Sequence, residues 1–227
     1  MVIPDLTSII FTAFVQEPWQ AHMSMASLAN ITRYTNPKDY ELIVMSDSEK
    51  FPIRDDYKVL KIDRYERTEG LSYTQSMNRG AKLAKGEYLC FFQNDVFVWY
   101  YWLDDLKEYV LKNLADCVIP DQVPRSYEDV EKIKLLDCEE AMYGSRDEGL
   151  LFITREAFKR TGGFNESLTL LQARDFYERM QNNGIRQIDT CKVIISHIMA
   201  ATNMNTLYKN PEQYDNLMRS DASLLNK

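Results

Sequence analysis

The chain has 227 residues, of which 45% are hydrophobic and 27% charged, and its formal net charge is −7. This composition is typical of a globular protein with one sizeable domain, and the negative charge argues against non-specific binding to a nucleic-acid backbone. No apolar run approaches the roughly 18 residues of a membrane span. The first residues, 1–5, lack a basic region ahead of an apolar one, so we expect a cytoplasmic protein without a signal peptide.

Short apolar runs alternate with helical patterns through the first half of the chain. The patterns predict strands and helices as follows: strands at 7–12, 40–45, 57–62 and 88–92, and helices around 21–29 and over 73–84. Such alternation predicts a parallel α/β sheet with right-handed crossovers. Ligands bind these sheets at the carboxyl ends of the strands.

The second half is less regular. Residues 121–149 are polar and without a clear period, and we expect loops and a short helix there. Beyond them the patterns predict the remaining elements: strands at 150–153 and 192–196, helices from about 155 and over 174–182, and a helical tail. Gly162 and Gly163 are expected to end the helix that begins near 155.

One predicted strand ends abruptly in polar side chains, at Gln93, Asn94 and Asp95. This order places a carboxylate at the carboxyl end of the strand, where it could hold Mg²⁺ or Mn²⁺ against phosphate oxygens. Because Asn and Asp also favour turns, a plain turn is the alternative. The four cysteines and two histidines are too dispersed for a structural zinc site, so a metal would have to bind oxygen ligands.

Five further segments complete a recognisable series: 9–14, 41–47, 70–80, 148–166 with its Gly-Gly-Phe-Asn-Glu turn, and 173–180. With the strand that ends at Asp95, they resemble glycosyltransferase family 2 of the GT-A fold, in matching order from about residue 7 to residue 201. The resemblance implies a mainly parallel central sheet flanked by helices, in one domain with a short helical carboxyl-terminal tail. It divides the chain as follows: a nucleotide-binding half of about 1–120, an acceptor-side half of about 121–201 and a tail of 202–227.

The resemblance implies that Asp95 binds the metal, as the last residue of an Asp-x-Asp-like motif, and that Gln93 and Asn94 approach the sugar nucleotide. Gln93 stands where a carboxylate is frequent, which leaves the strength and kind of metal use open. His197 follows an apolar strand, at the place of a histidine that completes the metal shell in several family members. A lone histidine is as often a core or surface residue.

Further donor contacts are implied at Thr12, Asp47, Asn78 and Arg79. Thr12 ends the first strand, which in the family lies against the base and ribose. Asp47 remains from a pair of aspartates and could accept a hydrogen bond from a nucleobase N–H, although a solvated loop acid is the alternative. Asn78 and Arg79 could reach the phosphates or the donor sugar, in a segment two residues longer than usual, but Arg79 could equally be a surface cation.

Asp175 is the candidate catalytic base, since the segment around it resembles the family's Glu-Asp helix start. Glycosyl transfer with inversion needs a carboxylate that takes the proton of the acceptor hydroxyl as its oxygen attacks the anomeric carbon. Asp is also frequent at helix starts for structural reasons. Ala173 replaces an acidic or glycine neighbour that is common in the family.

Candidate acceptor contacts are Trp99, Trp102 and Glu148, although packing is the commoner use of aromatic side chains. The sequence as a whole predicts a metal-dependent, inverting transfer from a nucleotide sugar, with UDP-sugars frequent among relatives, to a saccharide hydroxyl. A modified DNA base is a minority alternative for the acceptor. The departures at Gln93, Ser46 and Ala173 keep a catalytically silent binding module open, because a fold alone does not establish a function.

Overall fold

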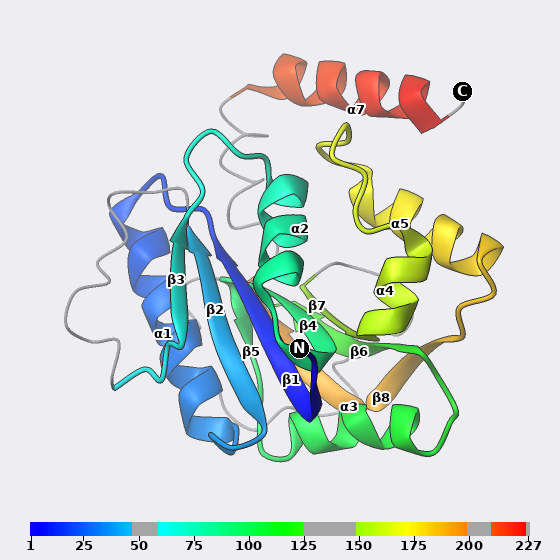
Figure 1. Cartoon of the computed structure of the whole chain (residues 1–227). Helices are drawn as coiled ribbons and strands as arrows, with labels where there is room; N and C mark the ends of the chain where they lie inside the picture. Colours follow the sequence, from blue (N-terminus) through cyan, green and yellow to red (C-terminus); the bar gives the residue numbers. More distant parts are fainter. Residues whose placement is uncertain (47–58, 125–148, 199–209, 226–227) are drawn as a thin grey trace.

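The computed structural model describes residues 1–46, 59–124, 149–198 and 210–225 (Figure 1). The described strands form one eight-stranded sheet in the order β3-β2-β1-β4-β7-β6-β8-β5. In chain order they span β1 (Ile3–Ala13), β2 (Tyr40–Ser46), β3 (Arg64–Arg67), β4 (Gly86–Gln93), β5 (Val96–Phe97), β6 (Cys117–Pro124), β7 (Leu150–Thr154) and β8 (Gln187–His197).

Most strands of this sheet point the same way. β1 pairs in parallel with β2 and β4, β2 with β3, and β6 with β8. β7 is antiparallel to both β4 and β6, so β4 and β6 are parallel to each other, and β5 is antiparallel to β8. The carboxyl ends of β1, β2, β3, β4, β6 and β8 therefore lie along one edge, and the prediction of a mainly parallel α/β sheet is confirmed.

Helices cover both faces of the sheet (Figure 1). Their bounds are α1 (Pro18–Tyr34), α2 (Tyr73–Leu83), α3 (Trp102–Leu111), α4 (Arg155–Thr161), α5 (Gln172–Asn182) and α7 (Pro211–Leu225). The apolar side chains of α1 and α3 join one core cluster, and those of α2, α4 and α5 join the other. None of the helices in the described ranges is long and apolar enough to cross a membrane.

The two cores explain why the strands read as continuous apolar runs. In β1, Ile9 and Phe11 belong to the core on the α1 side, while Ile10 between them belongs to the core on the α2 side. All three are fully buried. Successive side chains of a strand point to opposite faces, so a strand covered on both faces is apolar at every position.

The strand predicted at 57–62 is wrong where the structure describes it: residues 59–61 form a turn, and β3 begins only at Arg64. Leu60 in this turn and Ile62 directly after it are both buried, which explains why apolar residues occur here without a strand. Asp63 exchanges hydrogen bonds with Leu42, since its carboxylate accepts from the Leu42 N–H (2.8 Å) and its own N–H donates to the Leu42 carbonyl (3.0 Å). A side chain thus takes the place of a strand residue in the ladder.

Part of the stretch expected to be irregular is a strand. β6 continues through Pro120 to Pro124, and its pairing with β8 shifts register between Pro120 and Asp121. Such a bulge accommodates a residue that has no N–H to donate. Two further elements, β5 and α3, were not predicted either. Gly162 ends α4 as expected, with a φ of +85°.

Candidate active site

The fold brings the ends of β4 and β8 together at the carboxyl edge of the sheet. Val96, which follows Asp95, pairs with His197, and the Ile198 N–H donates to the Asp95 carbonyl (2.9 Å). On the other side of β4, Gln93 is in register with Thr12 at the end of β1. Residues from distant parts of the sequence therefore meet where parallel α/β sheets bind ligands.

Asp95 and His197 form a buried pair of opposed side chains. Their exposed fractions are 4% and 2%, and His197 Nε2 lies 3.3 Å from Asp95 Oδ1. The other ring nitrogen, Nδ1, lies 2.8 Å from Gln122 Oε1 on β6. Because an amide oxygen only accepts, this contact assigns the ring proton to Nδ1 and leaves the Nε2 lone pair directed at the carboxylate when the ring is neutral.

Two acceptor atoms that face each other across 3.3 Å are repulsive unless positive charge lies between them or on the ring. Apart from this ring, no described residue supplies Asp95 Oδ1 with a hydrogen-bond donor. Ligand atoms bound at about 2.1 Å to one divalent ion, at a right angle, lie about 3 Å apart. The pair therefore has the chemistry and the spacing of two ligands of one cation.

Gly149 leaves room for the imidazole. A Cβ on this residue would lie 3.0 Å from His197 Nδ1 and 3.1 Å from its Cε1, which is closer than ordinary contact. The Gly149 carbonyl also accepts from the Gln93 N–H (3.0 Å) and so ties β4 to the start of β7. Glycine at this position thus allows the backbone to approach the ring closely.

The two polar residues ahead of Asp95 differ in their contacts. Asn94 is buried and donates to Ser24 Oγ (2.8 Å), which fastens the end of β4 to the first half of α1. Gln93 is half-buried and donates to the Tyr73 hydroxyl (3.1 Å) at the start of α2. Asn94 therefore supports the turn from inside the protein, while Gln93 lies at its partly open side.

Thr12, predicted to approach the nucleotide, is 2% exposed, and its hydroxyl has no hydrogen-bond partner among the described residues. At the carboxyl end of a parallel strand, where such sheets bind ligands, this hydroxyl is a candidate ligand contact. Asp47 and Glu148, the other candidates near the strand ends, lie outside the described residues.

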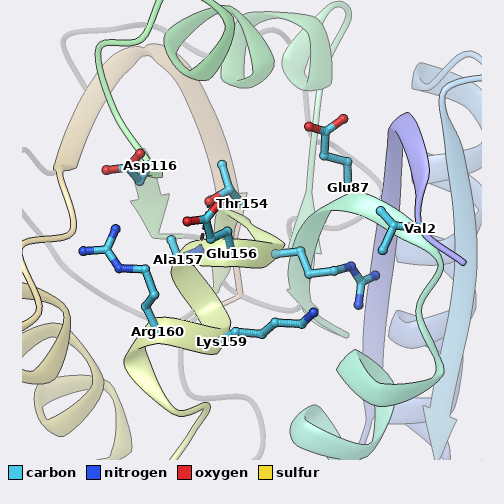
Figure 2. A pocket seen from close by; sticks show the side chains of 9 residues that line it. Val2, Glu87, Asp116, Thr154, Glu156, Ala157, Lys159 and Arg160 are labelled. Carbon is cyan, nitrogen blue, oxygen red and sulfur yellow. Dashed lines mark hydrogen bonds between the residues drawn. The ribbon is translucent and has the colours of Figure 1, made fainter.

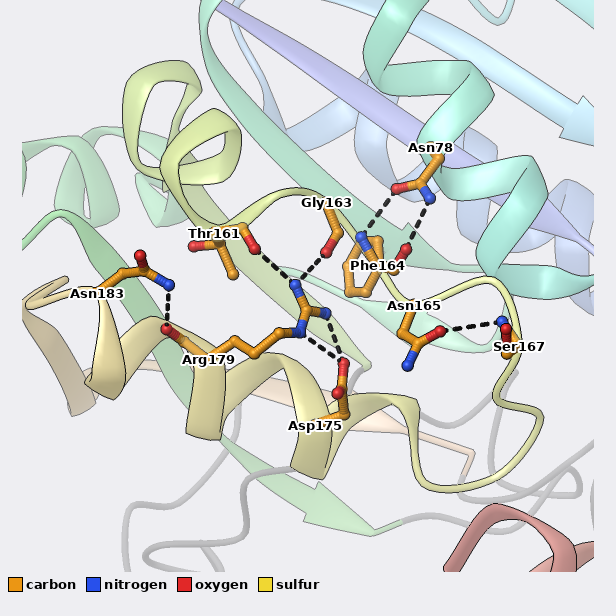
Figure 3. A network of polar contacts seen from close by, with 9 residues as sticks. All are labelled: Asn78, Thr161, Gly163, Phe164, Asn165, Ser167, Asp175, Arg179 and Asn183. Atoms are coloured by element: carbon orange, nitrogen blue, oxygen red, sulfur yellow. Dashed lines mark hydrogen bonds and ion pairs between the residues drawn. The ribbon is translucent and has the colours of Figure 1, made fainter. Parts of the chain in front are cut away.

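Asn78 is partly exposed and hydrogen-bonds to the turn that follows α4 (Figure 3). Its amide donates to the Phe164 carbonyl and to Glu166 Oε1 (2.9 Å each), and its oxygen accepts from the Phe164 N–H (2.9 Å). Both amide protons are used in these contacts. Asn78 thus joins α2 to the turn that follows α4, and its contact with the donor stays a prediction.

Arg79 also has a structural contact. Its guanidinium pairs with Glu66 on β3 (2.9 Å) and is about half exposed. Hydrogen bonding from Arg64, and then from Arg79, holds the pKa of Glu66 below its ordinary value. In the structure, Arg79 is therefore a surface cation paired with Glu66, which is the alternative that the sequence left open.

Asp175 lies in the first part of α5, 7% exposed, in a second polar cluster (Figure 3). Arg179, one turn further along α5, donates from Nε (2.8 Å) and Nη2 (2.5 Å) to the same oxygen, Asp175 Oδ2. Its Nη1 donates to the carbonyls of Thr161 and Gly163 at the end of α4. The arrangement fixes the carboxylate and leaves Oδ1 outside the ion pair.

Trp99 and Trp102 lie beside the carboxyl end of α1, away from the carboxyl ends of the strands where the predicted acceptor contact would be. Trp102 is 2% exposed and donates to Thr35 Oγ1 (3.0 Å), just beyond α1, and Trp99 contacts the ring of Tyr34 at the end of that helix. Ser24, which bonds Asn94, lies ten residues before Tyr34 on α1. At about 1.5 Å per residue, the tryptophans are therefore about 15 Å along this helix from the Asn94 end of β4. The correction is that Trp102 is a core residue.

The pocket drawn in Figure 2, with a volume of about 490 Å³, is also remote from this site. Its lining includes Glu87 at the start of β4 and Thr154 at the end of β7, which places it at the opposite edge of the sheet. Asp116 on its rim is paired with Arg186 (2.8 Å). None of the predicted site residues lines this pocket.

Sequence reasoning missed three residues that shape the site. Gln122 and Gly149 border or lie within the stretch taken for loops, and no local pattern linked them to His197. Arg179 carried a signal, because it stands four residues after Asp175 on a predicted helix, where side chains meet.

Comparisons with known proteins bear on the family and the fold of the chain. The family model of glycosyl transferase family 2 matches residues 10–165. No curated protein sequence matches the chain.

Similar solved structures include TarS 1–349 of S. aureus, with a TM-score of 0.64 at 14% identity over 86% of this chain and 61% of that one. The mannosyltransferase PcManGT from Pyrobaculum calidifontis, in complex with GDP-Man and Mn²⁺, has a TM-score of 0.67 at 17% identity over 90% and 61%. GalNAc-T7 with UDP, GalNAc and Mn²⁺ has a TM-score of 0.63 at 17% identity over 85% and 43%. The chain spans less than two thirds of each of these structures.

The likeness to these structures identifies the sheet and its helices as the GT-A fold expected from the sequence. The family model matches more than half of the residues and includes β4 and Asp95 after it. The chain therefore belongs to glycosyltransferase family 2.

Proposed function

We propose that this protein transfers a sugar from a nucleotide-sugar donor, held through a divalent cation, to an acceptor hydroxyl with inversion at the anomeric carbon. The observation that carries the proposal is the buried pair of Asp95 and His197, whose facing atoms are 3.3 Å apart. Family membership supports glycosyl transfer, and the structures of PcManGT and GalNAc-T7 contain Mn²⁺.

Asp95 and His197 would hold Mn²⁺ or Mg²⁺, with Gln122 keeping the imidazole in the tautomer that presents Nε2. Among the described residues no three His, Cys, Asp or Glu side chains gather, so diphosphate oxygens and water would fill the other positions. When bound, the cation neutralises the diphosphate and so stabilises it as a leaving group.

On the donor side, Thr12 offers a buried hydroxyl without a described partner, and Gln93 lies in register beside it. We assign this strand edge to the nucleotide and sugar of a UDP-sugar, with Asp47 as the predicted contact to the base. The sequence pattern at the strand ends supports the donor class.

Asp175 is the proposed base. Arg179 occupies one carboxylate oxygen with two N–H groups, and the other oxygen, Oδ1, is left to accept a proton. The acceptor hydroxyl would give its proton to Oδ1 while its oxygen bonds to the anomeric carbon and the bond to the diphosphate breaks. A saccharide is the proposed acceptor.

The test is the thermal stability of the protein against a panel of nucleoside diphosphates and UDP- and GDP-sugars, each with and without Mn²⁺ or Mg²⁺. A ligand that binds only the native state raises the melting temperature. We expect a rise with one nucleotide that requires the metal and is lost in Asp95→Ala and His197→Ala. His22→Ala, which removes an exposed histidine, is the matched control and should keep the rise.

A rise that is independent of metal, or that survives in Asp95→Ala, would contradict the assignment of the cation. A metal-dependent rise without hydrolysis or transfer of any donor sugar would favour the catalytically silent module. Release of the nucleoside diphosphate from one UDP-sugar, measured together with the rise, would support the transferase.

A further inference from the structure

The carboxyl-terminal helix α7 is fastened by one buried carboxylate. Asp221 is 2% exposed, while every other described side chain of α7 is at least partly exposed. Its Oδ2 accepts from three consecutive backbone N–H groups, of Thr169 (2.9 Å), Leu170 (2.6 Å) and Leu171 (3.0 Å). Hydrogen bonds to an ionised acceptor are the strong kind, and a buried charge requires them.

The three N–H groups belong to the backbone that leads directly into α5. Leu171 is the N-cap residue of α5, and its own apolar side chain cannot accept a capping hydrogen bond. The Asp175 N–H in turn donates to the Leu171 carbonyl (3.1 Å), which is the first helical bond that involves the proposed base. Asp221 thus brings a negative charge to the start of α5, where the helix dipole favours one.

Arg179 alone would not fix the position of this helix start. It lies on α5 and joins Asp175 to the end of α4 through the carbonyls of Thr161 and Gly163. The backbone ahead of α5 is held from the other side, by α7, which Figure 1 shows above the loop between α4 and α5. The two contacts together hold the segment between the end of α4 and Asp175.

We propose that Asp221 is a positioning residue for glycosyl transfer: it holds residues 169–171 and thereby sets the place of the Asp175 carboxylate. The inference rests on the proposed function, which makes Asp175 the base. The carboxyl-terminal helix is then part of the transfer machinery through its contact with residues 169–171. Small displacements of a reacting group are costly, about 100-fold in rate for about 1 Å.

The experiment compares Asp221→Ala with Asp221→Asn and with Asp215→Ala, which removes an exposed carboxylate from the same helix. Amide hydrogen exchange is measured over 169–176, with 88–92 of β4 as the reference segment. Turnover is measured as Mn²⁺-dependent hydrolysis of the UDP-sugar that the unmodified protein cleaves fastest. UDP with Mn²⁺ serves as the binding probe in a thermal shift.

In Asp221→Ala we expect exchange over 169–176 to rise at least about tenfold, with β4 unchanged. We expect kcat to fall at least about tenfold, while KM for the donor and the UDP shift change by less than about twofold. Asp221→Asn keeps an acceptor oxygen, so its exchange rate and kcat should lie between those of Asp221→Ala and the unmodified protein. Asp215→Ala should match the unmodified protein in both quantities.

Unchanged exchange in Asp221→Ala would overturn the contact, and faster exchange with unchanged kcat would overturn its role in positioning. A parallel loss of kcat, donor affinity and β4 protection in both Asp221 variants would mean that Asp221 only stabilises the fold. If the unmodified protein neither bound UDP with Mn²⁺ nor cleaved any donor, the proposed function itself would fail, and the exchange data would still decide the contact.

Discussion

The polar side chains predicted to bind the donor or the metal differ in their contacts. Asn78 has both amide protons and its oxygen engaged with the Phe164–Glu166 turn, so its hydrogen bonds are complete without a ligand. Asp95 Oδ1 and the Thr12 hydroxyl, in contrast, are buried and have no hydrogen-bond partner among the described residues. Because Asp95 and Thr12 also lie at the carboxyl ends of parallel strands, where such sheets bind ligands, these two atoms support a ligand site there.

Asp175 has one carboxylate oxygen bound by Arg179 and the other outside this ion pair, and this leads to a prediction about the base. Asp175→Asn keeps an oxygen for Arg179 but cannot take up the proton, so we expect turnover to fall about 10²- to 10⁴-fold. Binding of UDP with Mn²⁺, followed by the thermal shift, should persist. Glu178→Gln is the control, because Glu178 is a largely exposed acid on the same helix, paired only with Arg174 among the described residues. Full turnover in Asp175→Asn would refute the assignment.

Gln122 leads to a second prediction, about the imidazole. Gln122→Leu removes the acceptor of the Nδ1–H, so His197 loses its fixed tautomer and orientation. We expect the affinity for Mn²⁺ in the presence of UDP to fall about 10- to 100-fold, as for other partners of metal-bound histidines. Calorimetric titration of Mn²⁺ measures it. Gln122→Glu retains an acceptor and should bind Mn²⁺ at least as well; equal affinity of Gln122→Leu and the unmodified protein would count against the site.

At the scale of elements, four of the strands that the sequence predicts are covered on both faces. β1, β2, β4 and β7 have apolar runs because each contributes side chains to both cores. β3, with the sequence Arg-Tyr-Glu-Arg, is a partly exposed edge strand and has no such run. β6 was not predicted because Pro120 lies within it, at a bulge that accommodates proline. The strand β5 has only two residues, too few for a pattern, and α3 after it was not predicted either.

The junction between α2 and the turn after α4 gives a third prediction. Asn78→Ala leaves the Phe164 N–H and carbonyl without their partner, so we expect the free energy of unfolding to fall by about 1–3 kcal/mol. Urea denaturation measures this loss. The shift with UDP and Mn²⁺ should survive, and Lys82→Ala, an exposed change on the same helix, should alter neither quantity. Loss of the UDP shift at unchanged stability would support the donor role of Asn78.

At the scale of the whole molecule, topology decided which of the predicted site residues lie close together. Asp95 and His197 meet because β4 and β8 end at the same edge, so the order of elements was enough to place them. Trp102 was misplaced because closeness in sequence to Asp95 was taken for closeness in space. β5 runs against β8 and carries the chain to the other edge before α3 begins, and this reversal had no signal in the sequence.

The continuous sheet also predicts how the molecule unfolds. β4 and β7 join the half of about 1–120 to the half of about 121–201, and residues of both halves share each core. We therefore expect one cooperative transition, as for other single domains. The three tryptophans, Trp19, Trp99 and Trp102, all lie in the first half, so their fluorescence reports that half alone, while far-ultraviolet circular dichroism reports both. The urea midpoints from fluorescence and circular dichroism should coincide, and UDP with Mn²⁺ should raise both midpoints equally. A separate transition in the dichroism without a change in fluorescence would show that the halves unfold independently.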